Sequence, residues 1–263
     1  MDAAEIALLG DSLRGTMNRC RGSELDAALR EFGWLDLLRE SPDTAIPVVF
    51  GLLGETGSHA PVLNDVIAHA AGRQLPATVP MPYAGGRWVR WEREAGAGTD
   101  ADALDPELPL HTVASGETLP IAEARRALSW WLVGTSRTML DLARRHALDR
   151  VQFGRPISSH QAVRHRLAET LVAIEGAEAT LATAHDDLGA LLAKAAAGQA
   201  ARTASRNCQQ VMGGIGFTAE HDLHNHVRRA LVLDGLLGSG YELTREAGAW
   251  VRSHQSAPRL AQL

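Results

Sequence analysis

Two segments of the sequence place arginine, amide and aromatic side chains around a glycine turn. The first runs from Arg150 to Ile157 (R-V-Q-F-G-R-P-I), with Gln161 shortly after it, and the second runs from Gln209 to Phe217 (Q-Q-V-M-G-G-I-G-F). An arginine offers a fork of donors to phosphate oxygens, and glycine lets backbone N–H groups come close to a ligand. Helix ends supply further free N–H groups. The two segments therefore indicate a site for a diphosphate or for carbonyl oxygens.

Two other patterns suggest chemistry but have simpler explanations. His221, His224 and His226 lie close together, but only two of them can share a helix face and no cysteine lies nearby. We therefore expect a polar helix surface and no metal site. Ser239 lies between two glycines, but a G-x-S-x-G nucleophile turn needs glycine where this chain has leucine. Ser239 and Glu242 instead match a helix capping box.

The two glycine-turn segments resemble the acyl-CoA dehydrogenases, flavoproteins that oxidise acyl thioesters. The pattern R-x-x-F-G-x-P-I-x-x-x-Q begins at Arg150, and Q-x-x-G-G-x-G-F begins at Gln210, in the family's order and at its separation. Arg228 matches an arginine that follows in the family. The resemblance extends from about Pro120 to His254, roughly half of the chain, and the segment 32–35 resembles the family's first helical domain more weakly.

The resemblance implies that the C-terminal half binds the ADP portion of FAD across a dimer interface. The cofactor would be contacted by a guanidinium, an aromatic ring, two side-chain amides and the backbone of two glycines: Arg150, Phe153, Gln161, Gln210, Gly213 and Gly214. A purely structural arrangement of helices and turns is the alternative interpretation of these six residues.

The sequence departs from the family at the catalytic base. The family removes a proton with a glutamate while a hydride passes to the flavin. That glutamate falls on Leu237 here, and the position used by a subset of the family falls on Ala124. Neither side chain can accept a proton. Glu123 is one residue away, a rotation of about 100° on a helix. It is the fallback base, although an acidic residue in a first helical turn is the simpler interpretation.

Helices must position all of these residues. Apolar residues at helical spacing predict long helices in the C-terminal half and shorter ones before it. The long ones are expected at 120–154, from about 159 to 192, and at 195–212, followed by 220–233 and 241–254. The shorter ones are expected at 23–39, 44–53 and 62–71.

A segment rich in proline and glycine separates the two helical parts. Within it, residues 87–91 and 110–113 have the composition of strands. We expect a mainly α fold with an N-terminal helical domain (1–75), a linker or shortened β-domain (76–119) and a C-terminal long-helix bundle (120–263). A typical family member has a β-barrel-like middle domain, and residues 76–119 are too few to form it.

Composition excludes several classes of protein. The chain has 263 residues, 45% of them hydrophobic, and a formal charge of −5, which argues against a nucleic-acid partner. Only two cysteines are present, and no apolar run approaches the length of a membrane span. Residues 1–10 lack the pattern of a secretory signal, so we expect a cytoplasmic location.

The resemblance and the departures together predict a subunit that is not catalytic on its own. A second acyl-CoA dehydrogenase-like chain would supply the middle β-domain and the glutamate and would share the FAD, in a heterotetramer with two copies of each chain. Heteromeric enzymes of this type act in steroid degradation, so the resemblance implies a bulky, possibly steroid-derived acyl-CoA as substrate. One alternative is a non-catalytic scaffold that binds no flavin, and another is a non-redox enzyme that works alone in the vacated cleft.

Overall fold

The computed structural model describes residues 2–94 and 103–257, and helices make up most of this part of the chain. Five helices precede a small sheet: α1 (Ala3–Met17), α2 (Gly22–Glu31), α3 (Trp34–Glu40), α4 (Pro42–Thr56) and α5 (Leu63–Ala70). Five follow it: α6 (Ala122–Asp149), α7 (Gln161–Ala182), α8 (Asp187–Met212), α9 (Leu223–Gly235) and α10 (Gly240–His254). The mainly α fold predicted from the sequence is confirmed.

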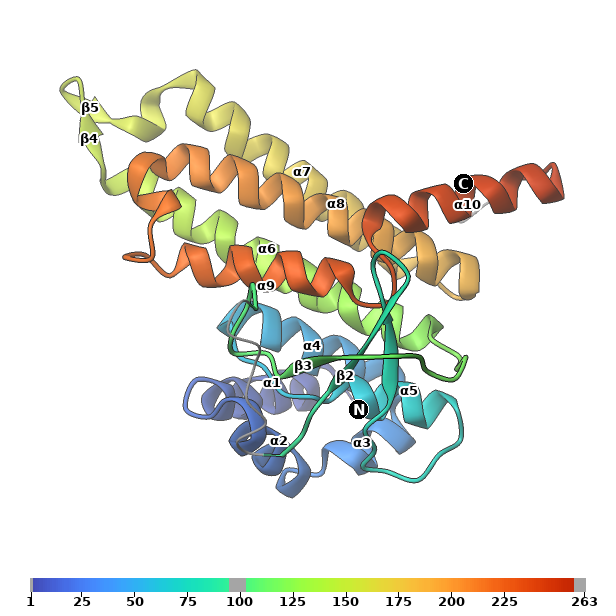
Figure 1. The fold of residues 1–263 in the computed structure, drawn as a ribbon. Coiled ribbons are helices and arrows are strands. Elements are labelled where there is room, and N and C mark those ends of the chain that lie inside the picture. Colours follow the sequence, from blue (N-terminus) through green and yellow to red (C-terminus); the bar gives the residue numbers. More distant parts are fainter. Residues whose placement is uncertain (1, 95–102, 258–263) are drawn as a thin grey trace.

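The three longest helices, α6, α7 and α8, pack together as the predicted bundle, with α9 beside α6 and α10 projecting from α8 (Figure 1). Leu128, Leu132 and Met139, which belong to the apolar stripe seen in the sequence, are fully buried on α6. Because these side chains recur every three to seven residues, one face of α6 turns continuously toward its neighbours. The stripe therefore holds the bundle together.

The predicted boundary between the second and third long helices is wrong. The chain leaves the helix after Ala182 and re-enters it at Asp187, so the break lies ten residues earlier than expected. Asp186 is the N-cap of α8, and its carboxylate accepts a hydrogen bond from the Gly189 N–H at 2.6 Å. Leucines continue at helical spacing on both sides of this turn because α7 and α8 bury their apolar faces in the same bundle. Periodicity alone therefore does not reveal the turn.

The helix predicted at 23–39 is also interrupted. Gly33 has φ of +94° between α2 and α3, a left-handed conformation that glycine adopts without a Cβ penalty. The structure adds α1, for which no helix was predicted. Its N-terminus carries a capping box in which the Asp2 carboxylate accepts from the Glu5 N–H at 2.8 Å.

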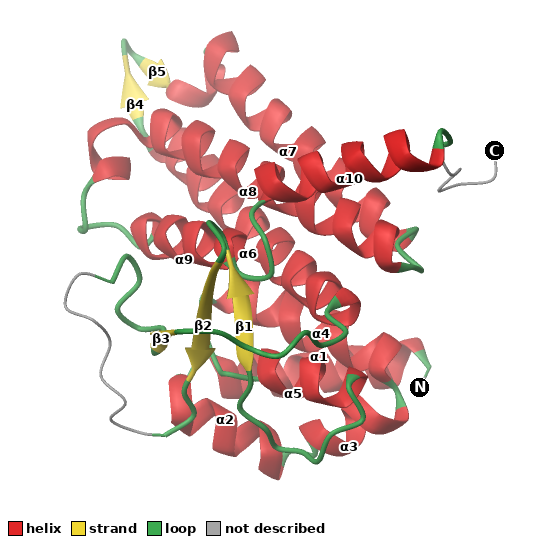
Figure 2. Cartoon of the chain, turned by 45° about the vertical axis from the view of Figure 1, so that its right-hand side comes forward, coloured by secondary structure: helices red, strands yellow, loops and turns green. Residues whose placement is uncertain are grey.

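The sheet has three antiparallel strands in the order β1 (Pro80–Tyr83), β2 (Arg87–Trp91) and β3 (Leu110–Val113). Both predicted strands are present with the predicted limits. Strand β1 was not predicted, because Pro80 and Pro82 cannot donate to a ladder and argue against a strand. They are tolerated because β1 is an edge strand, paired with β2 alone in the sheet. Figure 2 shows β1 and β2 crossing from the N-terminal helices toward α9.

A single hydrophobic core contains helices that precede the sheet in the sequence and helices that follow it. The rings of Trp34, Phe50 and Trp131 follow one another at centroid distances of 6.3 and 5.8 Å, and Trp91 of the sheet stacks on Trp131 at 5.8 Å. Helices α4 and α6 meet closely at Gly54, where an added Cβ would collide with the Trp131 carbonyl oxygen. The N-terminal helices are thus fixed against the bundle that carries the predicted site.

Candidate functional site

The structure places all six predicted cofactor residues at one end of the bundle. Arg150 ends α6, Phe153 lies in the hairpin that follows, and Gln161 is the first residue of α7. Gln210 is in the last turn of α8, and the two glycines begin the 3₁₀ turn η2 (Gly213–Phe217). Figures 1 and 2 both show the hairpin and the end of α8 at this end.

Hydrogen bonds between α7 and α8 bring the two motifs together. The Asn207 amide accepts from the Arg166 guanidinium at 3.1 Å and donates to the Arg166 carbonyl at 3.2 Å. The two helices run antiparallel, so the chain just before Arg166 lies beside the chain just after Asn207. Gln161 and Gln210 therefore lie at the same end, and both are exposed.

The hairpin presents Phe153 to solvent. Strands β4 (Val151–Gln152) and β5 (Arg155–Pro156) form it, and Phe153 and Gly154 take φ of +55° and +76° at its tip. A phenylalanine with positive φ is strained, and its side chain is 91% exposed. Exposure and strain together favour a binding role for this ring over a packing role.

The backbone of the second glycine turn, at Gly213 and Gly214, is open to a ligand. Gly213 takes φ of +65° at the C-cap of α8, and no atom lies within 4 Å of the Cβ position of Gly213 or Gly214. A ligand can therefore approach this backbone closely. Exposed arginine, two amides, an aromatic ring and open glycines form a donor set that fits the ADP portion of FAD. The six residues fit this group through their chemistry and their accessibility.

Large apolar side chains surround this end and remain exposed. They are Val151 (55%), Phe153, Ile215 and Phe217 (66%). Contiguous exposed apolar patches often mark interfaces or ligand sites, whereas single exposed apolar residues are ordinary on protein surfaces. This end therefore has the character of a surface that another molecule covers.

The turn between α9 and α10, where the family's glutamate falls on Leu237, is closed. Leu237 is 1% exposed with φ of +58°, and its N–H donates to the Pro82 carbonyl at 2.8 Å. The Ala84 N–H donates to the Gly235 carbonyl at 2.8 Å, and the Arg125 Nε donates to the Leu237 carbonyl at 3.2 Å. Strand β1 and the start of α6 thus cover the position from two sides.

Neither alternative position supplies a base at this turn. Ala124 is fully buried. Glu123 extends along the surface of α6, where its carboxylate accepts from the Arg126 guanidinium at 3.0 Å and is 40% exposed. This local ion pair agrees with the simpler interpretation of Glu123 as a first-turn acid.

A buried lysine donates hydrogen bonds to the backbone of the turn between α9 and α10. Lys194, the single lysine of the chain, donates from Nζ to the carbonyl oxygens of Asp234 at 3.0 Å and Gly238 at 3.4 Å. Burial lowers its pKa to about 8, although the nearby Asp234 carboxylate opposes this shift. Arg202 pairs with the same carboxylate at 2.8 Å. Sequence reasoning missed Lys194, because a lysine in an alanine-rich helix gives no signal of its depth.

The capping box at α10 is confirmed. The Ser239 N–H donates to the Glu242 carboxylate at 2.9 Å, and the Glu242 N–H donates to the Ser239 hydroxyl at 3.4 Å. The Gly85 N–H donates to the same carboxylate at 2.8 Å. These hydrogen bonds lower the pKa of Glu242 below its ordinary value. Ser239 therefore caps a helix, and the loop before β2 reinforces the cap.

The three clustered histidines have separate environments. His221 Nδ1 accepts from the Leu223 N–H at 3.1 Å, and His224 Nδ1 lies 2.7 Å from the His221 carbonyl oxygen. His226 is buried against α4 and its pKa is lowered to about 4, mainly by burial. Within residues 2–94 and 103–257, no group of three histidine, cysteine, aspartate or glutamate side chains could hold a metal ion. In the same residues, no helix combines the length and the apolar character that crossing a bilayer requires.

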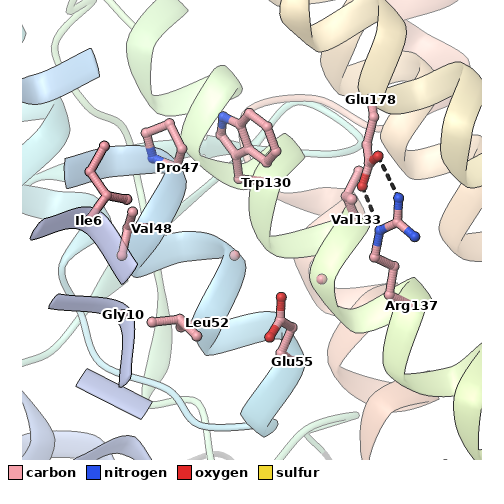
Figure 3. A pocket seen from close by; sticks show the side chains of 12 residues that line it. Ile6, Gly10, Pro47, Val48, Leu52, Glu55, Trp130, Val133, Arg137 and Glu178 are labelled. Atoms are coloured by element: carbon pink, nitrogen blue, oxygen red, sulfur yellow. Dashed lines mark hydrogen bonds and ion pairs between the residues drawn. The ribbon is translucent and has the colours of Figure 1, made fainter. Parts of the chain in front are cut away.

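A cavity of about 260 Å³ lies elsewhere, between α1, α4 and α6 (Figure 3). Its walls are largely apolar and include Pro47, Trp130 and Val133. Arg137 donates from Nε to Glu178 at 2.6 Å at its edge. Because this guanidinium is already neutralised, the cavity does not share the phosphate-binding character of the bundle end.

Comparisons with known proteins agree with these observations. The family model "Acyl-CoA dehydrogenase, C-terminal domain" matches residues 118–246. The acyl-CoA dehydrogenase IpdE2 of Mycobacterium tuberculosis is 34% identical over 200 residues, which are 72% of this chain and 58% of IpdE2. The acyl-CoA dehydrogenase FadE34 of the same organism is 40% identical over 129 residues, 45% of this chain and 17% of FadE34. The chain thus covers less than two thirds of each relative.

Two solved structures share the fold along nearly the whole chain. The Tcur3481-Tcur3483 steroid ACAD aligns with a TM-score of 0.74 and 17% identity, covering 97% of this chain and 99% of that one. The ChsE4-ChsE5 complex of Mycobacterium tuberculosis aligns with a TM-score of 0.65 and 17% identity, covering 98% and 100%. At this identity the likeness concerns the fold alone.

Proposed function

Because residues 118–246 match the acyl-CoA dehydrogenase C-terminal domain, we propose that this chain is a subunit of a heteromeric, FAD-dependent acyl-CoA dehydrogenase. In this proposal the chain supplies the dimer face and the ADP-binding part of the flavin site. A second, related chain supplies the catalytic glutamate and the β-domain that supports the flavin ring. The complex acts on an acyl-CoA in the cytoplasm.

One observation carries the proposal: the nucleotide motifs are complete and exposed, whereas the base position is occupied by a buried leucine. When bound, the flavin would supply the acceptor for the hydride that leaves the acyl thioester. Arg150 would place its guanidinium on the diphosphate, and the open backbone at Gly213 and Gly214 would lie against the same cofactor. Phe153 would cover the adenosine and exclude water from it.

Solved relatives support the partner and the substrate class. One shares this fold as a member of a steroid ACAD named for two proteins, and another as part of a two-protein complex. We therefore propose a heterotetramer with two copies of each chain and a bulky, steroid-derived acyl group. A stand-alone enzyme in a vacated cleft receives no support from the described residues, because β1 and α6 cover Leu237.

Co-purification with an acyl-CoA dehydrogenase-like partner tests the proposal. We expect the lone chain to be colourless and the complex to be yellow, with flavin that depends on this chain. Arg150→Ala is expected to lower bound flavin at least tenfold, since it removes a charge-assisted contact to phosphate. Arg252→Ala is the matched control, because Arg252 is an exposed arginine on α10, far from the bundle end. Unchanged flavin in the Arg150→Ala complex would instead favour the scaffold that binds none.

A further inference from the structure

The cavity between α1, α4 and α6 lies apart from the bundle end and from the turn at Leu237. Its volume of about 260 Å³ is just below the range of about 300 to 1,000 Å³ that drug-sized ligands occupy. It is larger than a cavity of about 150 Å³ that holds benzene. The space therefore suits a small molecule of roughly ten to fifteen non-hydrogen atoms.

Two glycines inside helices keep this cavity open. Gly10 of α1 and Gly51 of α4 both line it, and apart from its own stretch of helix no described atom lies within 4 Å of either Cβ position. Glycine weakens a helix relative to alanine, and close packing is the usual compensation. Gly134 of α6 has that compensation, because an added Cβ would collide with the Gly51 carbonyl oxygen. Gly10 and Gly51 gain no such packing, so their missing side chains leave room for a ligand.

The cavity has an apolar end and a polar end. Helices α4 and α6 run side by side in the same direction here, and the Thr138 hydroxyl donates to the Glu55 carbonyl at 2.9 Å. Pro47 and Trp130, both half-buried, form the apolar end with their rings (Figure 3). Glu55 lies eight residues after Pro47 on α4, about 12 Å further along the helix axis. A ligand that spans the cavity therefore meets two rings at one end and a carboxylate at the other.

The polar end offers an acceptor and lacks an unneutralised cation. The Arg137 guanidinium donates to Glu178 at 2.6 Å and to Glu175 at 2.9 Å, so two carboxylates neutralise it. Glu55 pairs through Oε2 with Arg14 at 2.8 Å, and no described residue donates to its Oε1. Figure 3 shows the Glu55 carboxylate between α4 and α6. This end thus favours a hydroxyl donor and disfavours an anion.

We propose that this cavity binds a neutral two-ring alcohol or phenol, with its rings against Pro47 and Trp130 and its hydroxyl donating to Glu55 Oε1. Burial of the rings supplies most of the affinity, and contact with the Trp130 indole adds to it. The hydroxyl fixes the orientation, since the cavity presents its free acceptor at one end. The proposal does not depend on the proposed function, because the cavity and the six nucleotide residues have no residue in common.

Equilibrium dialysis of the full chain against three naphthalene derivatives tests the proposal. We expect saturable binding of 2-naphthol at one site per chain. Naphthalene, which has no hydroxyl, should bind roughly fivefold more weakly, because the hydrogen bond to a carboxylate is lost. The anion 2-naphthoate should bind at least tenfold more weakly than 2-naphthol, because its charge faces Glu55. Binding of 2-naphthoate as tight as that of 2-naphthol would overturn the proposal.

Gly51→Met fills the cavity without removing any contact. Its side chain enters the open space at the Cβ position, and we expect 2-naphthol to bind at least tenfold more weakly. Methionine favours a helix more than glycine does, so urea unfolding should show that the variant is no less stable than the wild type. Gly248→Met is the matched control, because Gly248 is an exposed glycine inside α10 with an open Cβ position and does not line the cavity. The control should bind 2-naphthol as the wild type does.

Glu55→Ala separates the hydrogen bond from the shape of the cavity. We expect this variant to bind 2-naphthol roughly fivefold more weakly and naphthalene within about twofold of the wild type. A purely structural role for Glu55 would weaken both ligands equally, and that result would contradict the assigned acceptor.

The remaining outcomes decide between a ligand site and an interface. No saturable binding of 2-naphthol to the wild type, or wild-type affinity in Gly51→Met, would overturn the proposal. We expect the purified complex with the partner chain to bind 2-naphthol as the lone chain does, and loss of binding in the complex would show that the partner covers the cavity. Flavin content of a Gly51→Met complex should equal that of the wild-type complex, because the two sites are separate.

Discussion

The end of the bundle and the turn between α9 and α10 have opposite character. At the bundle end, Phe153 is exposed, Gly214 is open, and Arg150 has no ion-pair partner among the described residues. At the turn, Leu237 is buried, and hydrogen bonds to Pro82 and Arg125 close the backbone. Donors that would serve a ligand are kept accessible, whereas the place of the family's base is filled. The comparison supports the proposal that this chain contributes a binding surface and leaves proton transfer to a partner chain.

The strongest test of this contrast restores the missing carboxylate. Leu237→Glu would bury a carboxylate in a closed turn whose cations, Arg125 and Lys194, already bind backbone carbonyl oxygens, and we expect the free energy of unfolding to fall by about 4 kcal/mol. Urea unfolding measures the loss. Leu237→Gln has the same size without the charge and should lose only about half as much. A Leu237→Glu chain that is as stable as wild type would show that the turn is open in solution.

Acid should next lower the stability of the whole fold. Burial lowers the pKa of His59 and of His226 to about 4 from an ordinary value of 6.5. Between these pH values the unfolded chain binds protons that the folded chain does not, so stability is present above about pH 6.5 and is lost as the pH falls toward 4. Each histidine accounts for about 3 kcal/mol.

Unfolding by urea at several pH values measures this loss. His226→Gln should remove about half of the histidine-dependent slope, while His165→Gln, at an exposed position on α7, should leave the slope unchanged. Equal slopes in the wild type and the His226→Gln variant would contradict the assignment.

Lys194 provides a somewhat smaller test of the same turn. Lys194→Met leaves the carbonyl oxygens of Asp234 and Gly238 without their donor, and we expect a loss of about 2 kcal/mol in unfolding free energy. Arg202→Met is the control, because this half-exposed arginine binds the same Asp234 and should cost less than about 1 kcal/mol. If Lys194→Met and Arg202→Met lower the free energy of unfolding equally, the hydrogen bonds of Lys194 do not stabilise the turn.

A substitution at the bundle end should hardly change the free energy of unfolding. Phe153→Ala removes a ring that is almost fully exposed, so we expect a change below about 0.5 kcal/mol in thermal or urea unfolding. Phe50→Ala, in the core, should cost about 3 kcal/mol or more. The same Phe153→Ala variant is expected to bind less flavin within the complex. A large loss of stability in Phe153→Ala would show that the hairpin serves folding instead of binding.

Local signals in the sequence were sufficient for several features. Apolar residues at helical spacing predicted α6, the strand-forming composition of residues 87–91 predicted β2, and Ser239 with Glu242 predicted the cap of α10. These features depend on neighbours a few residues apart, which is the range that propensity and periodicity report. The turn between α7 and α8 escaped detection because the apolar pattern continues through it.

By itself, the sequence determined which chemical groups this chain possesses: the two glycine-turn motifs, and leucine and alanine where the family carries its base. Only the tertiary structure decided that β1 covers Leu237, that Lys194 lies beneath it, and that Gly10 and Gly51 line one cavity. These contacts join residues from 40 to more than 150 positions apart. No local pattern encodes such pairings, because burial and accessibility arise only when distant helices pack against one another.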